Sequence, residues 1–300
     1  MVTGRFELVQ QVGAGGMGAV WKARDHESGA TVALKFIHPL MADDPEYVRR
    51  FENEVDAPRR FNSPNVAQGL GYGRRDGLPY LVMEYVDGTS LAQLLESGRR
   101  FSWDEARAIG SAIARGLQAA HKAGVIHRDI KPSNVLFSRD GTVKLVDFGV
   151  ARTEGLTQHT QGPIGTLAYM APDTTPSPRM DLYSLGCVLF ELMTGTPPFV
   201  ATSVTAMLKA HAFQRPPLEK LPREARQVVK ALLEKQPARR PASASVVVAA
   251  LESGRPLASP EALATQTVIR IVTGGGHWSQ LWPRLVGTEI FVMVLYLRAS

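Results

Sequence analysis

The chain has 300 residues, a formal net charge of +6 and 44% apolar residues. This length and apolar content suffice for a large buried core, in one two-lobed domain or in two modest domains. The arginine pairs are scattered along the chain and form no basic stripe interleaved with aromatic residues, which argues against nucleic-acid binding. An acidic or phosphorylated protein partner is compatible with this charge.

The amino-terminal residues and the cysteine content both bear on the cellular compartment. The first residues lack the uninterrupted apolar stretch of a secretory signal, so we expect no export. The single cysteine, Cys187, excludes an intrachain disulfide. It lies in the apolar run 182–193, where we expect a buried, unreactive thiol. Both observations predict a cytoplasmic location.

The first part of the chain has the pattern of a small sheet with one helix. Strand-like runs occur at 6–12, 19–23, 31–37 and 80–86. A helix is expected to begin at Pro45 after the cap residue Asp44, with an apolar stripe that includes Val48 and Phe51.

After Gly88 the periodicity becomes helical. Ser102 and Glu105 have the spacing of a capping box, at the start of a helix that we expect to end at Gly124. Three further helices are expected at 182–193, 223–235 and 244–253. This second region is therefore expected to be mainly α.

Residues 255–300 form a tail of different composition. Its apolar stretch, 290–297, is shorter than the ~20 residues that a membrane-spanning helix needs. We therefore expect no membrane span in these residues, and a strand or short helix docked on the domain. The alternative is the stub of a membrane anchor.

Two acids and an amide stand around a predicted hairpin. Asp129 and Asn134 precede the strand-like run 135–137, and Asp147 follows the run 143–146. The turn between the two runs brings Asn134 and Asp147 to the same end of the hairpin. Transfer of a phosphoryl group needs a base near the incoming hydroxyl and oxygen ligands for magnesium, and these residues offer both. Ordinary polar surface residues do not explain this convergence.

Gly13, Gly15 and Gly18 are spaced so that backbone amides can approach phosphate oxygens. A Rossmann fingerprint requires a helix after the glycines, whereas the pattern here continues as a strand at 19–23. The glycines are therefore expected at the tip of a hairpin. A flexible turn without a ligand is the alternative.

Lys35 alternates with apolar neighbours along the strand 31–37 and is expected on its covered face. A buried ammonium group needs a partner, and Glu54, near the inward stripe of the predicted helix, is the candidate. The alternatives are a lysine on an exposed strand edge and a solvated glutamate.

Together these motifs resemble the eukaryotic-like Ser/Thr protein kinases, in particular the bacterial ones, over residues 5–254. The resemblance rests on the segments 13–20 (GAGGMGAV), 32–35 (VALK), Glu54, 83–86 (MEYV), 127–134 (HRDIKPSN), 147–149 (DFG), 165–166 (GT), 171–173 (APD) and Asp181. It implies an α+β, bilobal protein-kinase fold. A small β-rich N-lobe would span 1–86, a large mainly α C-lobe would span 87–254, and 255–300 would be a tail of unknown role.

The resemblance implies ATP in the cleft between the lobes and transfer of its γ-phosphate to Ser/Thr hydroxyls of protein substrates. Asp129 would be the catalytic base, Lys131 would steady the γ-phosphate, and Thr166 would line the acceptor site. Asn134 and Asp147 would hold Mg²⁺, with Mn²⁺ as the alternative ion.

Lys35, braced by Glu54, would contact the α- and β-phosphates. The resemblance implies further nucleotide contacts from Val12, Gly13, Ala14, Gly15, Gly16, Met17, Gly18, Val20, Ala33, Glu84, Val86 and Leu136. Of these, Glu84 and Val86 would meet the adenine edge through their backbones.

Autophosphorylation is expected in the loop 152–165, which holds Thr153, Thr157 and Thr160. Thr160 is the first choice, because Arg128 could then pair with its phosphate. An unmodified threonine is the alternative. A homodimer would allow phosphorylation in trans, and the sequence carries no readable signature of one.

Three features depart from the family pattern. Pro58, which costs ~3 kcal/mol inside a helix, must end or kink the helix of Glu54 and could loosen its contact with Lys35. Asp173 replaces the family's glutamate and is expected to pair with Arg240 over a shorter reach. The link 173–181 is short and contains two prolines.

Pro58 and Asp173 favour a competing function, a pseudokinase or nucleotide-binding signalling scaffold with weak or no turnover. The presence of four residues opposes it: Lys35, Asp129, Asn134 and Asp147. A small-molecule phosphotransferase is a third reading. It ranks last, because it would not be expected to carry Lys131 together with the segments 165–166 and 171–173.

Overall fold

The computed structural model describes residues 2–15, 18–148 and 164–254. Within these ranges it leaves out the side chains of residues 2, 3, 15, 46, 47, 50, 54, 55, 164 and 166. The described residues all belong to the first of two compact units, 1–259 and 260–300.

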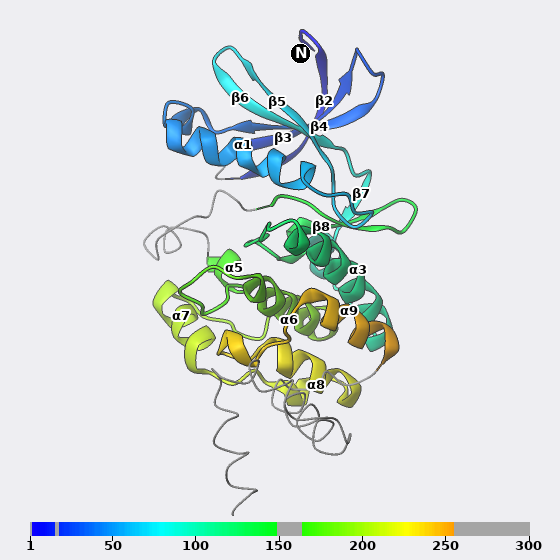
Figure 1. Ribbon diagram of the computed structural model, residues 1–300, viewed down its shortest axis with the longest axis vertical. Coiled ribbons are helices and arrows are strands. Elements are labelled where there is room, and N and C mark those ends of the chain that lie inside the picture. The colour runs from blue at the N-terminus through cyan, green and yellow to red at the C-terminus, as the bar shows by residue number, and fades with distance from the viewer. Residues whose placement is uncertain (1, 16–17, 149–163, 255–300) are drawn as a thin grey trace, which may run out of the picture. The chain divides into compact units, whose positions relative to one another are not determined.

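Residues 2–84 contain one antiparallel sheet, in the strand order β1-β2-β3-β4-β6-β5 (Figure 1). Its strands are β1 (Val2–Thr3), β2 (Phe6–Gly15), β3 (Gly18–Asp25), β4 (Thr31–Ile37), β5 (Gly69–Arg75) and β6 (Leu78–Glu84). The expected strands are confirmed. The edge strand β5 was not expected, because its glycines interrupt the alternation by which strands are recognised in a sequence.

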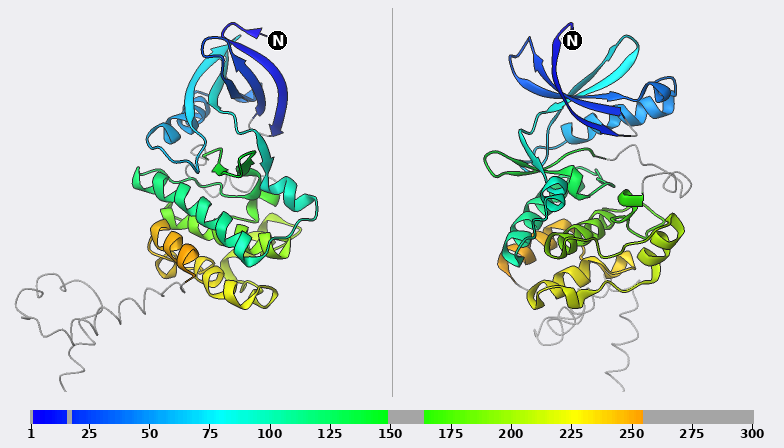
Figure 2. Two further views of the ribbon diagram at one scale, coloured as in Figure 1. Left: turned by 90° about the vertical axis from the view of Figure 1, so that its right-hand side faces the viewer. Right: turned by 180° about the vertical axis from the view of Figure 1, so that it is seen from behind.

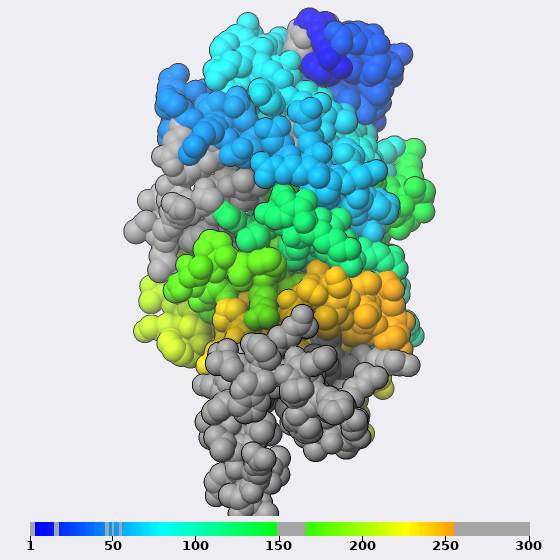
Figure 3. All heavy atoms as spheres, viewed as in Figure 1, coloured from blue at the N-terminus to red at the C-terminus, as the bar shows by residue number. Residues whose placement is uncertain are grey.

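The two faces of this sheet have different coverings. Val32 and Leu34 of β4 join one apolar cluster, whereas Ile37 packs on the other face against Val48 and Phe51 of helix α1 (Pro45–Arg59). This helix lies on the side of the sheet that faces the viewer in Figures 1 and 3. It begins where expected and ends one residue beyond Pro58, because proline cannot continue the helical hydrogen bonds.

Beyond residue 87 the described chain is mainly helical. Its α-helices are α2 (Leu91–Glu96), α3 (Trp103–Lys122), α5 (Ile164–Leu167), α6 (Pro178–Thr194), α7 (Val204–Phe213), α8 (Arg223–Leu232) and α9 (Ala244–Ser253). Short 3-10 turns occur here at η2 (Pro132–Asn134), η3 (Leu218–Lys220) and η4 (Pro237–Arg239), and one more, η1 (Pro39–Met41), precedes α1. Helices α2 and α7 were not expected, although a capping box of Ser90 and Gln93 signals the start of α2.

Helix α6 forms the centre of this region, because it is buried from Asp181 to Leu192. It starts earlier than expected, at Pro178. Helices α3 and α9 lie side by side (Figure 2), and the predicted capping box of Ser102 and Glu105 is present at the start of α3. Cys187 is buried in α6, and burial raises the pKa of its thiol, as expected for an unreactive group.

A second, three-stranded sheet lies at the junction of the two regions. It consists of β7 (Gly88–Ser90), β8 (Val135–Ser138) and β9 (Val143–Leu145), in the order β7-β8-β9. The predicted hairpin is therefore confirmed. Its strand β9 also pairs with the segment that leads from α1 to β5, through a parallel bridge between Val66 and Leu145.

No helix among the described residues is both long and apolar enough to span a bilayer. The tail from 255 onward, with its apolar run 290–297, lies outside the described residues. The expectations for it stay predictions.

His211 is a buried titratable group that helps to fix α7 on α6. Its Nδ1 lies 3.0 Å from the hydroxyl of Tyr183, and its carbonyl accepts a 2.6 Å hydrogen bond from Lys235. Burial, reinforced by the charge of Lys235, lowers the pKa of His211 to about 4. The imidazole is therefore neutral in the folded protein at neutral pH.

The low pKa of His211 predicts a loss of stability in acid. The unfolded chain, with the ordinary pKa of 6.5, binds this proton more readily, so stability falls as the pH drops from 6.5 towards 4. For His211→Asn, we expect the difference in unfolding free energy between pH 7 and pH 5 to shrink by about 2 kcal/mol. Urea unfolding at both pH values measures this, and equal pH dependences in the two proteins would contradict the assignment.

Candidate active site

The loop that carries Asp129 is held by a buried carboxylate from another element. Asp181, in the first turn of α6, accepts hydrogen bonds from the backbone N–H groups of His127 at 2.9 Å and Arg128 at 2.8 Å. Its Oδ2 atom also lies 2.7 Å from Nε2 of His121 on α3. Since Asp181 is 1% exposed, these bonds form without competition from water.

Within this loop, three predicted residues meet at one carboxylate. Lys131 Nζ lies 2.8 Å from Oδ2 of Asp129, and Asn134 donates from Nδ2 to the same oxygen at 3.0 Å. Asn134 also donates to the backbone carbonyl of Asp129 at 2.8 Å. These bonds use the amide N–H groups of Asn134, so its Oδ1 atom faces away from Asp129. The geometry suits a carboxylate that accepts a proton beside an amide oxygen that binds a cation.

Asp147 meets a lysine from the other end of the chain. Lys35, buried on β4, donates to Oδ1 of Asp147 at 3.3 Å. The covered position predicted for Lys35 is therefore confirmed. Glu54, its expected partner, lies on α1, and its side chain is not among those that the structure describes, so the pair stays a prediction.

The backbone around these groups adopts an uncommon conformation. Arg128 and Asp147 have φ angles of 65° and 55°, in the left-handed region that side chains disfavour. Such conformations cost of order 1–3 kcal/mol and persist only where the surroundings enforce them. Here the bonds from Asp181 fix Arg128, and a hydrogen bond from the N–H of Val146 to the carbonyl of Asn134 fixes the approach to Asp147.

Phe148 anchors the residue after Asp147. Its ring is 2% exposed and lies 4.4 Å, between centroids, from His127 and 5.8 Å from Phe61. Phe61 follows directly on α1, so the same ring connects that helix with the loop. His127 is fully buried, and burial lowers the pKa of its imidazole.

The glycine-rich segment joins two antiparallel strands, which confirms the hairpin and excludes the Rossmann arrangement. Gly15 pairs with Gly18 at its tip, and Val20 lies directly opposite Lys35 on β4. Gly18 has a φ angle of 138°, and a Cβ there would lie 1.8 Å from the carbonyl oxygen of Phe36. Only glycine fits this position. Gly16 and Met17 lie outside the described residues.

The residues expected around adenine border the junction between the two regions. Ala33 pairs with Met83, beside Glu84 at the end of β6, and Val86 is buried just beyond. Leu136 lies on β8. Val12 and Ala14 lie on β2, next to the glycine hairpin. The contacts of these residues with a nucleotide stay predictions.

Asn134 and Asp147 offer a magnesium ion an amide oxygen and a carboxylate. Both are hard oxygen donors of the kind that Mg²⁺ prefers. Among the described residues no group of three His, Cys, Asp or Glu side chains could hold a metal ion. An amide oxygen and a carboxylate fit a magnesium ion that takes its other ligands from phosphate oxygens and water.

Asp173 forms the predicted pair with Arg240. The guanidinium lies 2.8 Å from Oδ2, and both side chains are buried. Arg240 also donates to the carbonyls of Arg179, Glu234 and Lys235. Asp173 contacts the arginine through Oδ2, whereas its Oδ1 atom is buried and has no hydrogen-bond partner among the residues that the structure describes.

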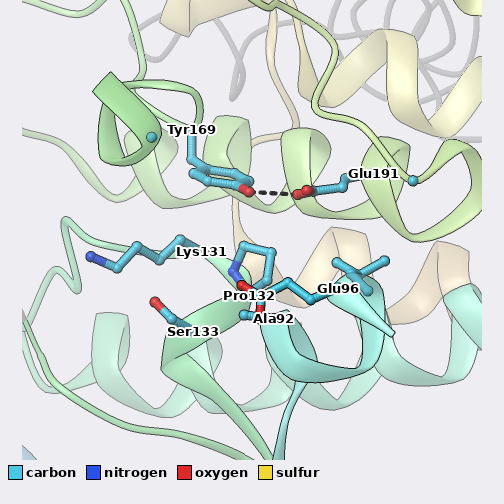
Figure 4. Close-up of a pocket in the computed structure, with 10 residues that line it drawn as sticks. Ala92, Glu96, Lys131, Pro132, Ser133, Tyr169 and Glu191 are labelled. Atoms are coloured by element: carbon cyan, nitrogen blue, oxygen red, sulfur yellow. Dashed lines mark hydrogen bonds between the residues drawn. The ribbon is translucent and has the colours of Figure 1, made fainter. Parts of the chain in front are cut away.

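A groove of about 370 Å³ lies between Lys131, Pro132 and Ser133 on one side and Tyr169 and Glu191 on the other (Figure 4). Its walls come from the loop, from α2 and from α6, and include Glu96 and Glu191. The hydroxyl of Tyr169 donates to Glu191 at 2.6 Å, and burial raises the pKa of that carboxyl. Thr166 lies on α5, beside Gly165 of this groove, and its side chain is not among those described.

The prediction from the sequence missed or misplaced three residues of the site. Asp181 was expected before the buried helix, whereas it lies inside it. A carboxylate at the start of a largely apolar helix was the signal that could have revealed its role. His121 and Phe61 carried no comparable signal. The threonines at 153, 157 and 160 lie outside the described residues.

Comparisons with known proteins agree on one family. The protein kinase domain family matches residues 6–250. A protein of Clostridium perfringens, named a probable serine/threonine-protein kinase, is 36% identical over 83% of this chain and 38% of its own length. The serine/threonine-protein kinase PknA of Mycobacterium tuberculosis is 35% identical over 85% of this chain and 63% of its own. The chain thus spans less than two thirds of these relatives.

A solved structure supports the same assignment. The kinase domain of Mycobacterium tuberculosis PknI matches with a TM-score of 0.65 and 27% identity, over 85% of this chain and 98% of that domain. The bilobal α+β fold implied by the sequence is therefore confirmed, and so is the resemblance on which it rested.

The bonds of Asp181 predict that its replacement disorders the loop. Asp181→Asn places an N–H₂ group against two backbone donors, so we expect the unfolding free energy to fall by roughly 2–4 kcal/mol. Amide hydrogen exchange at His127 and Arg128 should accelerate. Asp76→Asn, at a side chain that is 87% exposed, is the matched control and should change neither. Unchanged exchange at both loop amides would contradict the role given to Asp181.

Proposed function

The chain belongs to the protein kinase family, and we propose that it is an ATP-dependent kinase that phosphorylates Ser/Thr hydroxyls of proteins. One observation carries the proposal. Asp129, Asn134 and Asp147 converge at the end of a hairpin, within reach of the buried Lys35. A general base, two metal ligands and a phosphate-binding lysine are the groups that phosphoryl transfer requires.

Asp129 takes the role of general base. Its carboxylate would accept the proton of the acceptor hydroxyl as the oxygen attacks the γ-phosphorus. Lys131, 2.8 Å away, would then contact the transferred phosphate and stabilise its negative charge. A lysine two residues after the base is typical of Ser/Thr kinases, so the acceptor is an aliphatic alcohol in preference to tyrosine.

Asn134 and Asp147 would hold the divalent ion. When bound, that ion neutralises charge on the β- and γ-phosphates. Their oxygen donors favour Mg²⁺, with Mn²⁺ as the alternative. Lys35 would contact the α- and β-phosphates, braced by Glu54, and the backbone amides of the glycine hairpin would cover them.

The groove beside Lys131 is the place for a protein substrate. It is lined by Lys131, which contacts the proposed base, by Gly165, the neighbour of Thr166, and by α2 and α6. An extended acceptor segment that lies in it would bring its hydroxyl to Asp129. Thr166 would line the site at the acceptor.

The same proposal covers domain organisation and regulation. Residues 1–86 and 87–254 would act as the two lobes around the nucleotide, and 255–300 would be a tail without an assigned role. Autophosphorylation within 152–165, first at Thr160, would create a partner for Arg128, and a homodimer would allow it in trans. The setting would be the cytoplasm, where ATP is available and the buried Cys187 stays reduced.

The competing proposal is a nucleotide-binding scaffold without turnover. The unpaired Oδ1 of Asp173 favours it, because a poorly satisfied anchor weakens the segment that presents the acceptor. The described catalytic groups oppose it, since Lys35, Asp129, Asn134 and Asp147 all stand at positions suited to the reaction.

Incubation with Mg-ATP and mapping of phosphate by mass spectrometry separates these functions. We expect phosphothreonine within 153–166, and at least ~100-fold less in Asp129→Asn and Asp147→Asn, because each lacks an essential group. Asp104→Asn, at a side chain that is 85% exposed, is the matched control and should label like the wild type. Equal labelling of the two active-site variants would reveal a contaminating kinase. Bound ATP without labelling would establish the scaffold.

A further inference from the structure

An ion pair joins the end of the N-terminal sheet to the hairpin of the second sheet. Lys144 Nζ, on β9, lies 2.9 Å from Oε1 and 3.2 Å from Oε2 of Glu84, on β6. The two side chains are 17% and 31% exposed, so water screens this pair less than a pair on the open surface. Neither the proposed chemistry nor the family motifs use Lys144.

Further hydrogen bonds tie Glu84 to a third segment. Its Oε2 atom accepts the N–H of Gln68 at 3.1 Å, and its own N–H donates to the carbonyl of Gln68 at 2.9 Å. The next residue back, Ala67, donates to the carbonyl of Leu145 on β9 at 2.9 Å. Glu84 is therefore connected to β9 by two routes, one through the backbone of 67–68 and one through Lys144.

Lys144 shares its face of the hairpin with Leu136. The two residues are directly opposite in the β8–β9 pair, and residues opposite each other point to the same side of a sheet. Val143 and Leu145, which point to the other side, are buried in the main core. The side with Lys144 and Leu136 is thus the one that faces Glu84.

We propose that Lys144 is a positioning residue for the adenine slot. The adenine slot is the space between the backbone of residues 84–86 and Leu136. The pair of Lys144 with Glu84 fixes the end of β6, and so holds this backbone at its place opposite Leu136. The inference rests on the proposed function, because that proposal places adenine between these residues. Lys144 acts through Glu84 and touches none of the reacting atoms.

Lys144 is expected to affect the affinity for adenine and not the phosphoryl-transfer step. Asp129 and Asn134 are bonded to each other, Asp181 holds their loop, and a hydrogen bond from Val146 to Asn134 fixes the approach to Asp147. None of these bonds involves Lys144. Loss of its charge should therefore change how adenine is bound and leave the transfer step intact.

The test compares Lys144→Met with Lys144→Arg. For Lys144→Met we expect the KM for ATP and the Kd for adenosine to rise by the same factor, about threefold to tenfold, with kcat within about twofold of the wild type. Lys144→Arg keeps the cation and should restore both affinities. Steady-state kinetics and calorimetric titration with adenosine provide the two measurements.

Two further variants separate positioning from general stabilisation. Glu84→Gln should reproduce the loss of Lys144→Met, and the double variant should be no worse than either single one, because both remove the same pair. Arg139→Met breaks an exposed pair between the turn of the same hairpin and Asp87, at 3.0 Å, in which the arginine is 83% exposed. It is the matched control, with unchanged adenosine affinity.

The adenosine titration keeps this inference distinct from the proposed activity. A wild-type protein that binds adenosine without transferring phosphate would refute the kinase proposal and still report on Lys144. Equal adenosine affinity in the wild type and Lys144→Met would overturn the role of Lys144 whatever the activity. A fall in kcat without a change in either affinity would overturn it too. Absence of adenosine binding by the wild type would overturn both proposals.

Discussion

A single buried carboxylate supports the geometry of the active site. Asp181 stands in the first turn of a largely apolar helix and accepts hydrogen bonds from two backbone N–H groups of the loop that carries Asp129. A buried carboxylate is costly unless it is fully hydrogen-bonded, and the loop amides supply those bonds. The carboxylate of the helix and the backbone N–H groups of the loop thus satisfy each other's hydrogen-bonding capacity. This exchange holds Arg128 in its left-handed conformation and so sets the direction in which Asp129 points.

A second constraint acts between the two regions of the chain. Lys35 from the sheet meets Asp147 from the hairpin, and Lys144 from the hairpin meets Glu84 from the sheet. The first pair is where a nucleotide's phosphates and their metal ion would insert, so it is expected to rearrange on binding. The second lies at the opposite end of the proposed nucleotide, beside adenine, and has no reason to open. Under the proposed function, one pair would respond to the ligand, while the other would maintain the adenine slot.

The departures from the family pattern weigh less against activity than the sequence alone implied. Helix α1 ends just past Pro58, and Phe61 then packs on Phe148, so the chain beyond the helix still supports the segment of Asp147. The short link before α6 does not disturb that helix, because Pro178 occupies the first helical turn, where proline is tolerated. Of the three departures, Asp173 is the one that leaves a defect in the described part of the chain, a buried oxygen without a hydrogen-bond partner there.

The sequence by itself predicted most of the longer helices and strands, and the family resemblance named the candidate catalytic groups. Alternation along β4, the capping box of α3 and the turn between β8 and β9 are local patterns that can be read from neighbouring residues. The family motifs, too, are recognised by the spacing of residues along the sequence. The pair of Asp173 and Arg240 was also predicted, from the family resemblance. Only the tertiary structure decided two other contacts between distant groups. Lys35 contacts Asp147 across 112 residues of sequence, and Lys144 contacts Glu84 across 60. The partner of a buried charge depends on how separate elements pack, and no local periodicity records that packing.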